Sequence, residues 1–381
     1  MSNLETLAAL FATGGIELRR GPLFDKTPPS LPPSPRLRDR VEGMLLGLAI
    51  GDALGNTSEG LLPGERRARY GEVRDYLPNR YAEGRRVGLP SDDTQLAFWT
   101  LAQLLEDGGL VPEHLARRFA AERIFGIGST ARGFLANLNA GVPWHQAGPH
   151  SAGNGALMRI APVVLPHLSD PSPALWADTA LAAMLTHNDS ASTAACLPFV
   201  RLLWELLGRD TPPAPEWWLD RYLETARELE LDKPYTPRGG AYPDFRGPLW
   251  RYVEKVVPPA WAEGLDMVAA GQRWHSGAYL LETVPSVLYL LMRHGHDPEE
   301  AIVRAVNDTL DNDTIAAIVG AAVGALHGRS RLPTGWVENL LGRTAAEDDG
   351  QVFELLEAAC ERWVSATREG MPAPPVPRSH P

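Results

Sequence analysis

Two short segments of the sequence each place carboxylates and a hydroxyl at the start of a predicted helix. The first reads Ser-Asp-Asp-Thr at 91–94, and the second reads Asp-Asn-Asp-Thr at 311–314. Serine and aspartate are favoured helix N-caps and acids suit the first helical turn, so capping explains either segment alone. Two such segments in one chain instead favour a shared site for Mg²⁺, Mn²⁺ or Ca²⁺, which prefer oxygen ligands. The candidate ligands are Ser91, Asp92, Asp93, Asp311, Asp313 and Thr314.

Two further acids lie in and after the predicted helix 37–55. Asp52 falls on the same face of this helix as Val41, Leu45 and Leu48. An unpaired carboxylate on an apolar face is costly, so Asp52 either caps a neighbouring segment or supports a polar site. Glu59 follows four residues after Gly55 and lies in a predicted loop.

Two glycine-rich segments, 125–130 and 151–156, offer a different chemistry. Glycine lets backbone N–H groups approach a phosphate, and a following helix N-terminus favours negative charge. An ordinary turn explains either segment equally well. A histidine between two predicted helices, in Thr-His-Asn-Asp at 186–189, has the alternatives of a cap or a satisfied core hydrogen bond. The candidate binding residues are Gly126, Gly128, Ser129, Ser151, Gly153, Asn154, Gly155 and His187.

The elements that must position these residues are helical almost throughout. Apolar residues repeat with a period near 3.6, and the alternating pattern of strands is scarce. No internal repeat is visible, so the sequence predicts one large all-α domain. The predicted helices span 37–55, 94–107, 112–125, 130–138, 173–187, 190–208, 216–229, 248–269, 278–294, 298–308, 312–328 and 350–367.

Glycine recurs at every fourth residue in two of these helices, at 43, 47, 51 and 55 and at 320, 324 and 328. Each glycine costs roughly 1 kcal/mol relative to alanine inside a helix, so the stripe needs a reason. Close approach of two helix backbones supplies one. Membrane helices use the same device, but Glu42 and Asp52 interrupt the first stripe. We therefore expect these two helices to pack at the centre of the domain.

Composition shifts divide the chain into three parts, and the second of them contains an insertion. Residues 1–36 contain PPSLPPSP at 28–35, which cannot continue a helix, so they are predicted to form an arm set apart from the core, with one short helix at 4–11. Residues 37–370 form the helical domain. Within it, 209–247 is rich in proline and glycine and is predicted to be a loop-rich insertion. Residues 371–381 are predicted to form a flexible tail.

Charge and cysteine content exclude several classes of protein. The chain has 381 residues, a net charge of −11 and only two cysteines. Nucleic-acid binding is not expected, because phosphate neutralisation needs clustered basic residues. A disulfide framework and a cysteine-rich zinc site are excluded. The most apolar stretch, 44–54, is about half a membrane span, and no signal-peptide pattern is seen, so we expect a cytoplasmic protein with no membrane contact.

Six segments in order read GMLLGLAIGDALG, SDDTQLAFWTL, GNGALMRIAPV, LTHNDSAS, SGAYLLETVPSVLYLL and DNDTIAAIVGAAVGALHG. Together they resemble the ADP-ribosylglycohydrolase family over roughly 37–368. That family includes the dinitrogenase-reductase-activating glycohydrolase and hydrolases of ADP-ribosyl-arginine and ADP-ribosyl-serine. The resemblance implies an all-α fold with two Mg²⁺ ions in a central cleft, Mn²⁺ being an alternative.

The resemblance also implies roles for the residues named above. The six oxygen ligands at 91–93 and 311–314 match the family's metal-ligand positions, and Glu59 matches an acidic loop residue near the metals. The glycine-rich segments and His187 fall where the family binds ADP-ribose. Two positions depart from the family pattern: Ser91 and Asn312 stand where threonine is common. Ser91 keeps the oxygen ligand, so the implied metal site is unaffected.

The expected function is metal-dependent hydrolysis that removes ADP-ribose from a modified protein side chain, with arginine favoured. Asp93 and Glu59 are the candidates for orienting or deprotonating the water, and the sequence does not divide these roles. One alternative is an immunity protein that also blocks an ADP-ribosyltransferase toxin through its N-terminal arm. Another is an inactive structural relative, against which the intact oxygen set argues.

Overall fold

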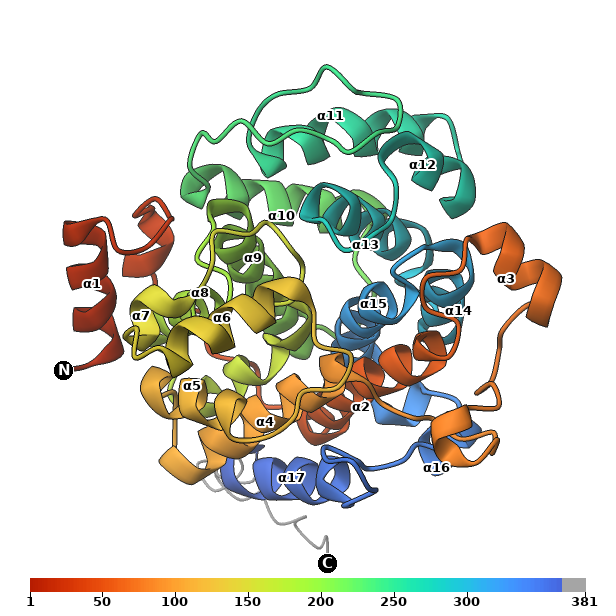
Figure 1. Ribbon diagram of the computed structural model, residues 1–381, viewed down its shortest axis with the longest axis horizontal. Helices are drawn as coiled ribbons and strands as arrows, with labels where there is room; N and C mark the ends of the chain where they lie inside the picture. Colours follow the sequence, from red (N-terminus) through yellow and green to blue (C-terminus); the bar gives the residue numbers. More distant parts are fainter. Residues whose placement is uncertain (365–381) are drawn as a thin grey trace, which may run out of the picture.

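Two helices without an exposed residue form the centre of the structure, a computed structural model that describes residues 1–364. They are α2 (Leu37–Asn56) and α15 (Asn312–His327). A helix that has no exposed face must be enclosed by other parts of the chain. Figure 1 shows α2 and α15 next to each other, with the other helices around them.

The glycine stripes of α2 and α15 face each other, which confirms the predicted close approach. A Cβ atom added to any glycine of the α2 stripe would overlap backbone atoms of α15, and the converse holds for Gly320 and Gly324. The two backbones therefore pack without intervening side chains. This crossing places the C-terminal end of α2 against the first turn of α15. The facing pairs are Gly43 with Gly324, Gly47 with Gly320, Gly51 with Ala316 and Gly55 with Asp313.

The remaining helices surround this pair. Those of the first half of the chain are α1 (Asn3–Thr13), α3 (Pro63–Tyr70), α4 (Asp92–Asp107), α5 (Pro112–Ala121), α6 (Ser129–Asn139), α7 (Trp144–Ala147), α8 (Ala174–Met184) and α9 (Ser190–Leu207). Those of the second half are α10 (Pro215–Leu229), α11 (Leu249–Ala262), α12 (Met267–Trp274), α13 (Leu280–His294), α14 (Pro298–Asp308), α16 (Thr334–Glu338) and α17 (Gln351–Ala359).

Short helical turns complete the secondary structure, and residues 1–364 contain no β-strand beyond three isolated bridges. The all-α prediction is therefore confirmed, with one continuous apolar core. No helix in this range is long and apolar enough to cross a membrane. The turns are η1 (Pro22–Asp25), η2 (Arg80–Ala82), η3 (Leu157–Arg159), η4 (Ala161–His167), η5 (Arg329–Arg331) and the π-helical η6 (Cys360–Val364).

One predicted helix, 248–269, is in fact two. Helix α11 ends at Ala262, and α12 begins at Met267. Between them Gly264 adopts φ +67°, a left-handed conformation that ends a helix. Asp266 then caps α12 by accepting a hydrogen bond from the Ala269 N–H at 2.8 Å. A glycine and an aspartate are both ordinary signals of a helix boundary. The strong apolar periodicity of this segment nevertheless led to the prediction of one continuous helix.

The N-terminal arm is packed against the core, which corrects the prediction that it stands apart. Its short helix forms as predicted but with wider bounds, 3–13. The indole N–H of Trp176 donates to the Lys26 carbonyl at 2.7 Å, and that of Trp204 donates to the Pro29 carbonyl at 2.9 Å. Proline removes N–H donors but leaves carbonyls able to accept, so a proline-rich segment can still dock. The buried apolar side chains of the arm are Leu7, Leu10, Ile16, Leu18, Leu23 and Phe24.

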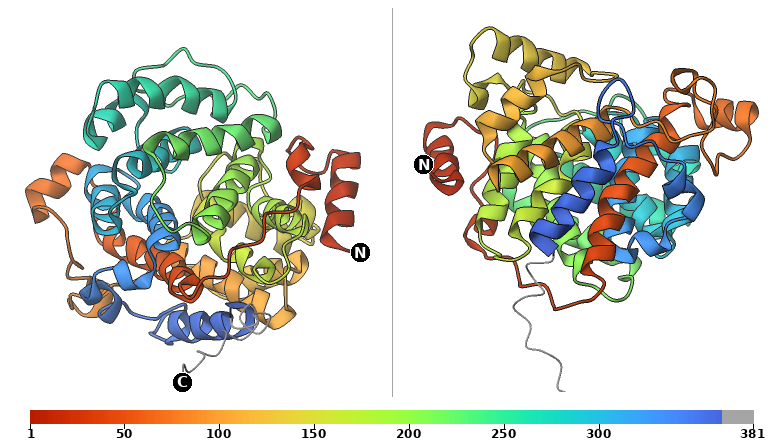
Figure 2. Two further views of the ribbon diagram at one scale, coloured as in Figure 1. Left: turned by 180° about the vertical axis from the view of Figure 1, so that it is seen from behind. Right: turned by 90° about the horizontal axis from the view of Figure 1, so that it is seen from below.

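The path of the arm is visible from behind the molecule. In Figure 2, left, the segment after α1 runs across α8 and α9 before it enters α2. The predicted insertion, 209–247, contains α10 and then a loop. The loop is tied down where the Tyr235 hydroxyl donates to the Asp189 carboxylate at 2.8 Å, beside the start of α9. The predicted tail, 371–381, lies outside the described residues.

Candidate active site

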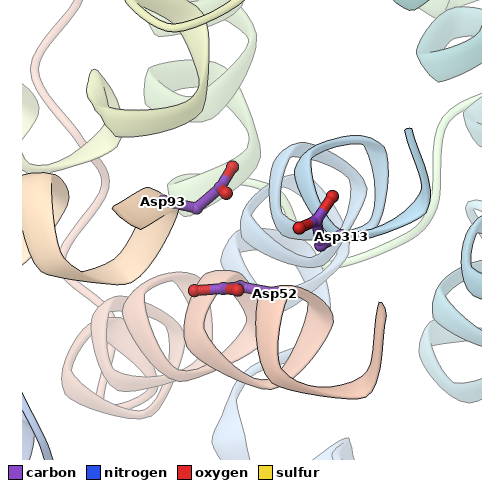
Figure 3. Close-up of side chains that lie close together, drawn as sticks. All are labelled: Asp52, Asp93 and Asp313. Atoms are coloured by element: carbon purple, nitrogen blue, oxygen red, sulfur yellow. The ribbon is translucent and has the colours of Figure 1, made fainter. Parts of the chain in front are cut away.

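Three aspartates from three helices meet where α2 ends and where α4 and α15 begin (Figure 3). Asp52, Asp93 and Asp313 are all buried, and each contributes a carboxylate oxygen to a group whose atoms lie within 4.8 Å of one another. A second group, made by Glu59, Asp311 and Asp313, satisfies the same limit and shares Asp313. The structure thus joins the two acidic motifs, whose first residues are 220 positions apart along the chain, into one acidic cluster.

Asp52 fulfils both of the roles considered for it. Its carboxylate accepts hydrogen bonds from the Ser91 N–H at 3.1 and 2.9 Å, from the Thr94 N–H at 3.0 Å and from the Thr94 hydroxyl. It therefore caps α4 in place of a residue of α4 itself. Because that cap fixes the first turn of α4, it also fixes Asp93, which lies in that turn.

The donor set of the acidic cluster fits a divalent cation. Asp93 Oδ2 accepts from the Ser91 hydroxyl at 3.2 Å, but Asp93 Oδ1 is buried without a hydrogen-bond partner among residues 1–364. A buried carboxylate oxygen without a partner is expensive unless a cation binds it. The surrounding ligand atoms are all oxygens, which suits Mg²⁺ or Mn²⁺ rather than a thiolate-preferring metal. The acidic cluster is therefore a candidate metal site.

Burial raises the pKa of every acid in the cluster, and repulsion from neighbouring carboxylates adds to this for all of them except Asp52. Burial, reinforced by the neighbouring Asp52 carboxylate, raises the pKa of Asp92 to about 7. Burial likewise raises the pKa of Asp311 to about 7, although the hydrogen bond from Asn154 opposes it. For Asp93 and Asp313, burial and nearby carboxylates raise the pKa well above the usual range. Bound cations would relieve this repulsion.

The remaining predicted ligands lie around the two groups. Ser91 and Asp92 begin α4, and Thr314 lies in the first turn of α15, where its N–H donates to Asp313 Oδ1 at 2.8 Å. Asp92 belongs to neither group of converging oxygens. Its carboxylate instead faces Gly126, where an added Cβ would lie 3.3 Å from Asp92 Oδ1.

The structure brings the second glycine-rich segment to the acidic cluster through Asn154. The Asn154 amide donates to Asp311 Oδ2 at 2.6 Å and to the Thr283 hydroxyl at 3.1 Å. On either side of it, Gly153 and Gly155 pack against the His187 ring. A Cβ at Gly155 would lie 2.8 Å from the ring, so glycine is needed there.

His187 is a buried, neutral histidine. Its Nδ1 lies 2.9 Å from the Thr186 hydroxyl, and burial lowers its pKa to about 3. The core hydrogen bond considered for it is therefore present. Asp189, two residues later, caps α9 through the Ala191 N–H at 3.0 Å.

The first glycine-rich segment lies against the second. The Ser151 hydroxyl is 2.8 Å from the Thr130 hydroxyl, in the first turn of α6. Gly126 takes φ +47°, and Gly128 is the N-cap of α6, with Ser129 as its first residue. The N–H groups at the start of α6 and the backbone near Asp92 therefore belong to one region next to the acidic cluster.

Two residues that support this region were not identified from the sequence. Gln95 accepts from the Phe125 N–H at 2.8 Å and donates to the Thr344 carbonyl at 2.9 Å, which ties two loops to α4. Arg66, in α3, binds the loop that carries Glu59. Helix α3 was not predicted from the sequence. Arg66 lies among other charged residues at 65–69, a pattern that is typical of exposed side chains. Pro63 and Glu65 were the available signals of a helix start, since the Leu62 N–H donates to the Glu65 carboxylate at 3.0 Å.

Comparisons with known proteins point to one family. A sequence profile described as ADP-ribosylglycohydrolase matches residues 33–368. The chain is 27% identical to an ADP-ribosyl-[dinitrogen reductase] glycohydrolase of Rhodospirillum rubrum, over 85% of this chain and 98% of that protein. It is 28% identical to an ADP-ribosylarginine hydrolase Tri1 of Pseudomonas putida, over 79% and 74% of the two chains. A solved ADP-ribosylglycohydrolase-related protein complex superposes with a TM-score of 0.63 at 26% identity, over 88% of this chain and 99% of that one.

Proposed function

This chain belongs to the ADP-ribosylglycohydrolase family, and from that premise we propose that it removes ADP-ribose from a modified protein side chain. The reaction is hydrolysis of the bond between the side chain and the anomeric carbon of the ribose. One observation carries the proposal: two separate acidic motifs converge on one cluster, in which the buried Asp93 Oδ1 has no hydrogen-bond partner within residues 1–364.

In this proposal the acidic cluster would hold two Mg²⁺ ions, with Mn²⁺ as a substitute. The residues that bind them are Ser91, Asp92, Asp93, Asp311, Asp313 and Thr314, with Glu59 on the adjoining loop. Bound Mg²⁺ supplies Lewis acidity towards the ribose hydroxyls and offsets the charge of the carboxylates. The support is that two groups of converging carboxylate oxygens lie side by side and share Asp313, a donor set that would suit two cations.

The protein's own groups then act on the water and on the sugar. Glu59 and Asp93 are the two carboxylates proposed to orient the attacking water and accept its proton. As the bond to the side chain breaks, positive charge develops at the anomeric carbon, and the surrounding carboxylates stabilise it. The departing side chain takes up a proton, and the sugar carbon gains the hydroxyl. Glu59 is exposed to solvent and Asp93 is buried, so only Glu59 can exchange its proton directly with bulk water.

The two glycine-rich segments are proposed to bind the rest of ADP-ribose. Their backbone N–H groups and the start of α6 suit the pyrophosphate, because a helix N-terminus favours negative charge. The residues are Gly126, Gly128, Ser129, Ser151, Gly153, Asn154, Gly155 and His187. Asn154, which contacts Asp311, would connect this region to the metals.

We favour arginine as the modified side chain. The support is the printed activity of the Pseudomonas putida relative, an ADP-ribosylarginine hydrolase. The alternative of an immunity protein that blocks a toxin through its arm gains no support from the fold. The apolar side chains that such a plug would offer, Leu7 and Leu10 among them, are already buried against the protein itself.

The test is hydrolysis of ADP-ribosyl-arginine and ADP-ribosyl-serine peptides, with Mg²⁺ and after chelation. We expect release of ADP-ribose from the arginine peptide only when the cation is present. Asp92→Ala and Asp313→Ala should each lower turnover at least about a hundredfold. They should leave the melting temperature of the metal-free protein unchanged or higher, because like-charge repulsion falls.

Asp39→Ala is the matched control, since it removes a carboxylate at the opposite end of the α2–α15 pair, where Asp39 accepts from the Ser330 N–H. It should keep full turnover. Full activity after exhaustive chelation, or wild-type turnover in Asp313→Ala, would contradict the metal assignment. Release from the serine peptide alone would leave the reaction in place and change the substrate.

A further inference from the structure

Glu59 differs from the other acids of the cluster because no helix carries it. It lies between α2 and α3 on a loop that begins at Thr57, and its side chain is exposed. A carboxylate on a free loop would lose conformational entropy each time it met a ligand. Some other contact must therefore hold this loop beside Asp311 and Asp313.

Arg66 makes that contact with all five of its N–H groups. Its Nε donates to the Ser58 hydroxyl at 3.0 Å, and its Nη2 donates to the carbonyls of Ser58 at 3.4 Å and Leu61 at 2.9 Å. These acceptors stand on both sides of Glu59. The guanidinium therefore holds the loop on both sides of Glu59 without contacting Glu59 itself.

The other end of the guanidinium binds the segment that precedes the second acidic motif. Arg66 Nη1 donates to the carbonyls of Asn307 at 3.0 Å and Thr309 at 2.9 Å. Asn307 lies in the last turn of α14 and Thr309 directly after it, shortly before Asp311. One side chain thus ties the Glu59 loop to the segment that carries the other two acids of its group.

Asn312 strengthens the same connection from α15. Its amide donates to the Ser58 hydroxyl at 3.0 Å and to the Gly55 carbonyl at 3.2 Å. The Ser58 hydroxyl in turn donates to Gly55 at 3.3 Å. The Asn312 amide thus binds the Glu59 loop, although Asn312 itself lies between Asp311 and Asp313 of the cluster.

The burial of Arg66 is unusual for a charged residue on a peripheral helix. Helix α3 lies at the edge of the molecule in Figure 1, yet the Arg66 side chain has no exposed surface. Its hydrogen bonds go to neutral oxygens rather than to a carboxylate. A buried cation without a paired anion is costly, and lysine could not make five bonds in this planar arrangement. The geometry is that of a clamp on two chain segments.

We propose that Arg66 is a positioning residue that clamps the Glu59 loop onto the turn before Asp311, so that Glu59, Asp311 and Asp313 together bind a divalent cation. This inference rests on the proposed function, because it requires that the acidic cluster bind cations. Arg66 does not touch the cation or the substrate. It acts on both through the position of Glu59.

The experiment titrates Mn²⁺ into the full-length protein by calorimetry, in wild type, Arg66→Lys and the control Arg40→Lys. Arg40 is also a fully buried arginine, and it bonds to the Leu207 carbonyl and Asp210 about 18 Å along α2 from Asp52. We expect both variants to melt at a lower temperature than wild type. Only Arg66→Lys should lose one equivalent of Mn²⁺ or bind it at least about tenfold more weakly.

Hydrolysis provides a second readout. The Mg²⁺ concentration that gives half-maximal activity should rise by the same factor in Arg66→Lys and stay unchanged in Arg40→Lys. Ser58→Ala serves if Arg66→Lys does not fold, because it removes the hydroxyl shared by Arg66 and Asn312 without burying a new charge. It should weaken Mn²⁺ binding in the same direction.

Two results overturn the inference in distinguishable ways. If wild type binds Mn²⁺ and folded Arg66→Lys or Ser58→Ala binds it with the same affinity and stoichiometry, then Arg66 only stabilises the fold and the proposed function stands. If wild type binds no divalent cation, the proposed function fails first and the clamp fails with it.

Discussion

The α2–α15 crossing and the N-terminal arm hold the molecule together by opposite means. In the crossing, the absence of side chains at Gly47 and Gly320 lets two backbones touch. In the arm, side chains such as Leu7 and Phe24 and the carbonyls of Lys26 and Pro29 fasten an extended segment to α8 and α9. The crossing ends at the acidic cluster, whereas these contacts of the arm lie on other helices. Changes in the crossing should therefore reach the metal site, and changes in the arm should alter stability alone.

The largest effect is expected at the middle of the crossing. Gly47→Leu or Gly324→Leu would force a side chain into the opposite backbone, which cannot move aside as a flexible side chain can. Overpacking usually costs about 1–3 kcal/mol, and we expect more than about 3 kcal/mol here. Thermal and denaturant unfolding measure the loss. Gly64→Leu is the control, because Gly64 is a helical glycine with open space at its Cβ position. An unchanged melting temperature in Gly47→Leu would show that the crossing is not tight.

The next effect should come from the arm. Leu7 is 2% exposed and Leu4 is 40% exposed on the same short helix, α1. Removing a buried leucine side chain costs about 2–5 kcal/mol, and we expect about 2 kcal/mol for Leu7→Ala because a surface helix can relax. Leu4→Ala should stay within about 0.5 kcal/mol of wild type. Both variants should keep full hydrolysis per folded molecule, and lost activity in Leu7→Ala would place the arm in the active site.

Deletion of residues 1–36 extends this test to the immunity alternative. The composition of the arm predicted little change in stability, but its buried contacts now predict a lower melting temperature. Lost affinity for a partner transferase, with stability and hydrolysis intact, would instead identify the arm as a toxin plug. If neither the melting temperature nor the affinity for a partner changed, the arm would be a loosely attached leader.

A smaller effect separates the two ends of the α2 glycine stripe. A Cβ at Gly55 would overlap the Cα and N of Asp313, whereas one at Gly43 would meet the backbone of Gly324 and Gly328 at the far end. Gly43→Ala should lower the melting temperature and leave Mn²⁺ binding unchanged. Gly55→Ala should also weaken Mn²⁺ binding about tenfold, because Asp313 is displaced. Equal Mn²⁺ affinity in the two variants would mean that the crossing does not position the cluster.

The same two regions show what the sequence could and could not predict. A glycine at every fourth residue has few physical explanations, so the crossing and its central place were predictable. The convergence of the acids at 91–93 and 311–313 was predictable because both begin helices and both match one family. The docking of the arm was not predictable from the sequence. A high proline content shows that backbone N–H donors are missing, but it does not show what the carbonyl groups and the scattered leucines of the arm contact.

Tertiary contacts explain the other omissions. Arg66 carries no local signal of burial, because its acceptors at Asn307 and Thr309 lie more than 240 positions away. Gln95 is equally ordinary in sequence, and its partner Thr344 lies at a similar separation. The roles of such residues depend on which loops the fold brings together. Local periodicity and capping rules describe a helix and its ends but not that assembly.

The smallest expected effect is the pH dependence of protein stability that arises from the acidic cluster, which lies at one end of the α2–α15 crossing. Burial raises the pKa of Asp92 and of Asp311 to about 7 in the folded protein, whereas aspartate in an unfolded chain titrates near about 3.9. Between these values the folded state binds more protons than the unfolded state. Since stability rises with pH only where the unfolded state binds more protons, the metal-free protein should lose stability as pH rises through this interval, up to about 7.

Melting temperatures in chelator and in Mg²⁺ test this directly. In chelator the melting temperature should be higher near about pH 6 than near about pH 8. In Mg²⁺ the trend should reverse, because protons compete with the cation at low pH and the bound cation stabilises only the folded state. Asp311→Asn should flatten the chelator curve, while the arm variant Leu7→Ala should shift the curve down without changing its slope. A chelated wild-type protein that gains stability from about pH 6 to about pH 8 would mean that the carboxylates at the end of the crossing are not held in a buried, mutually repelling cluster.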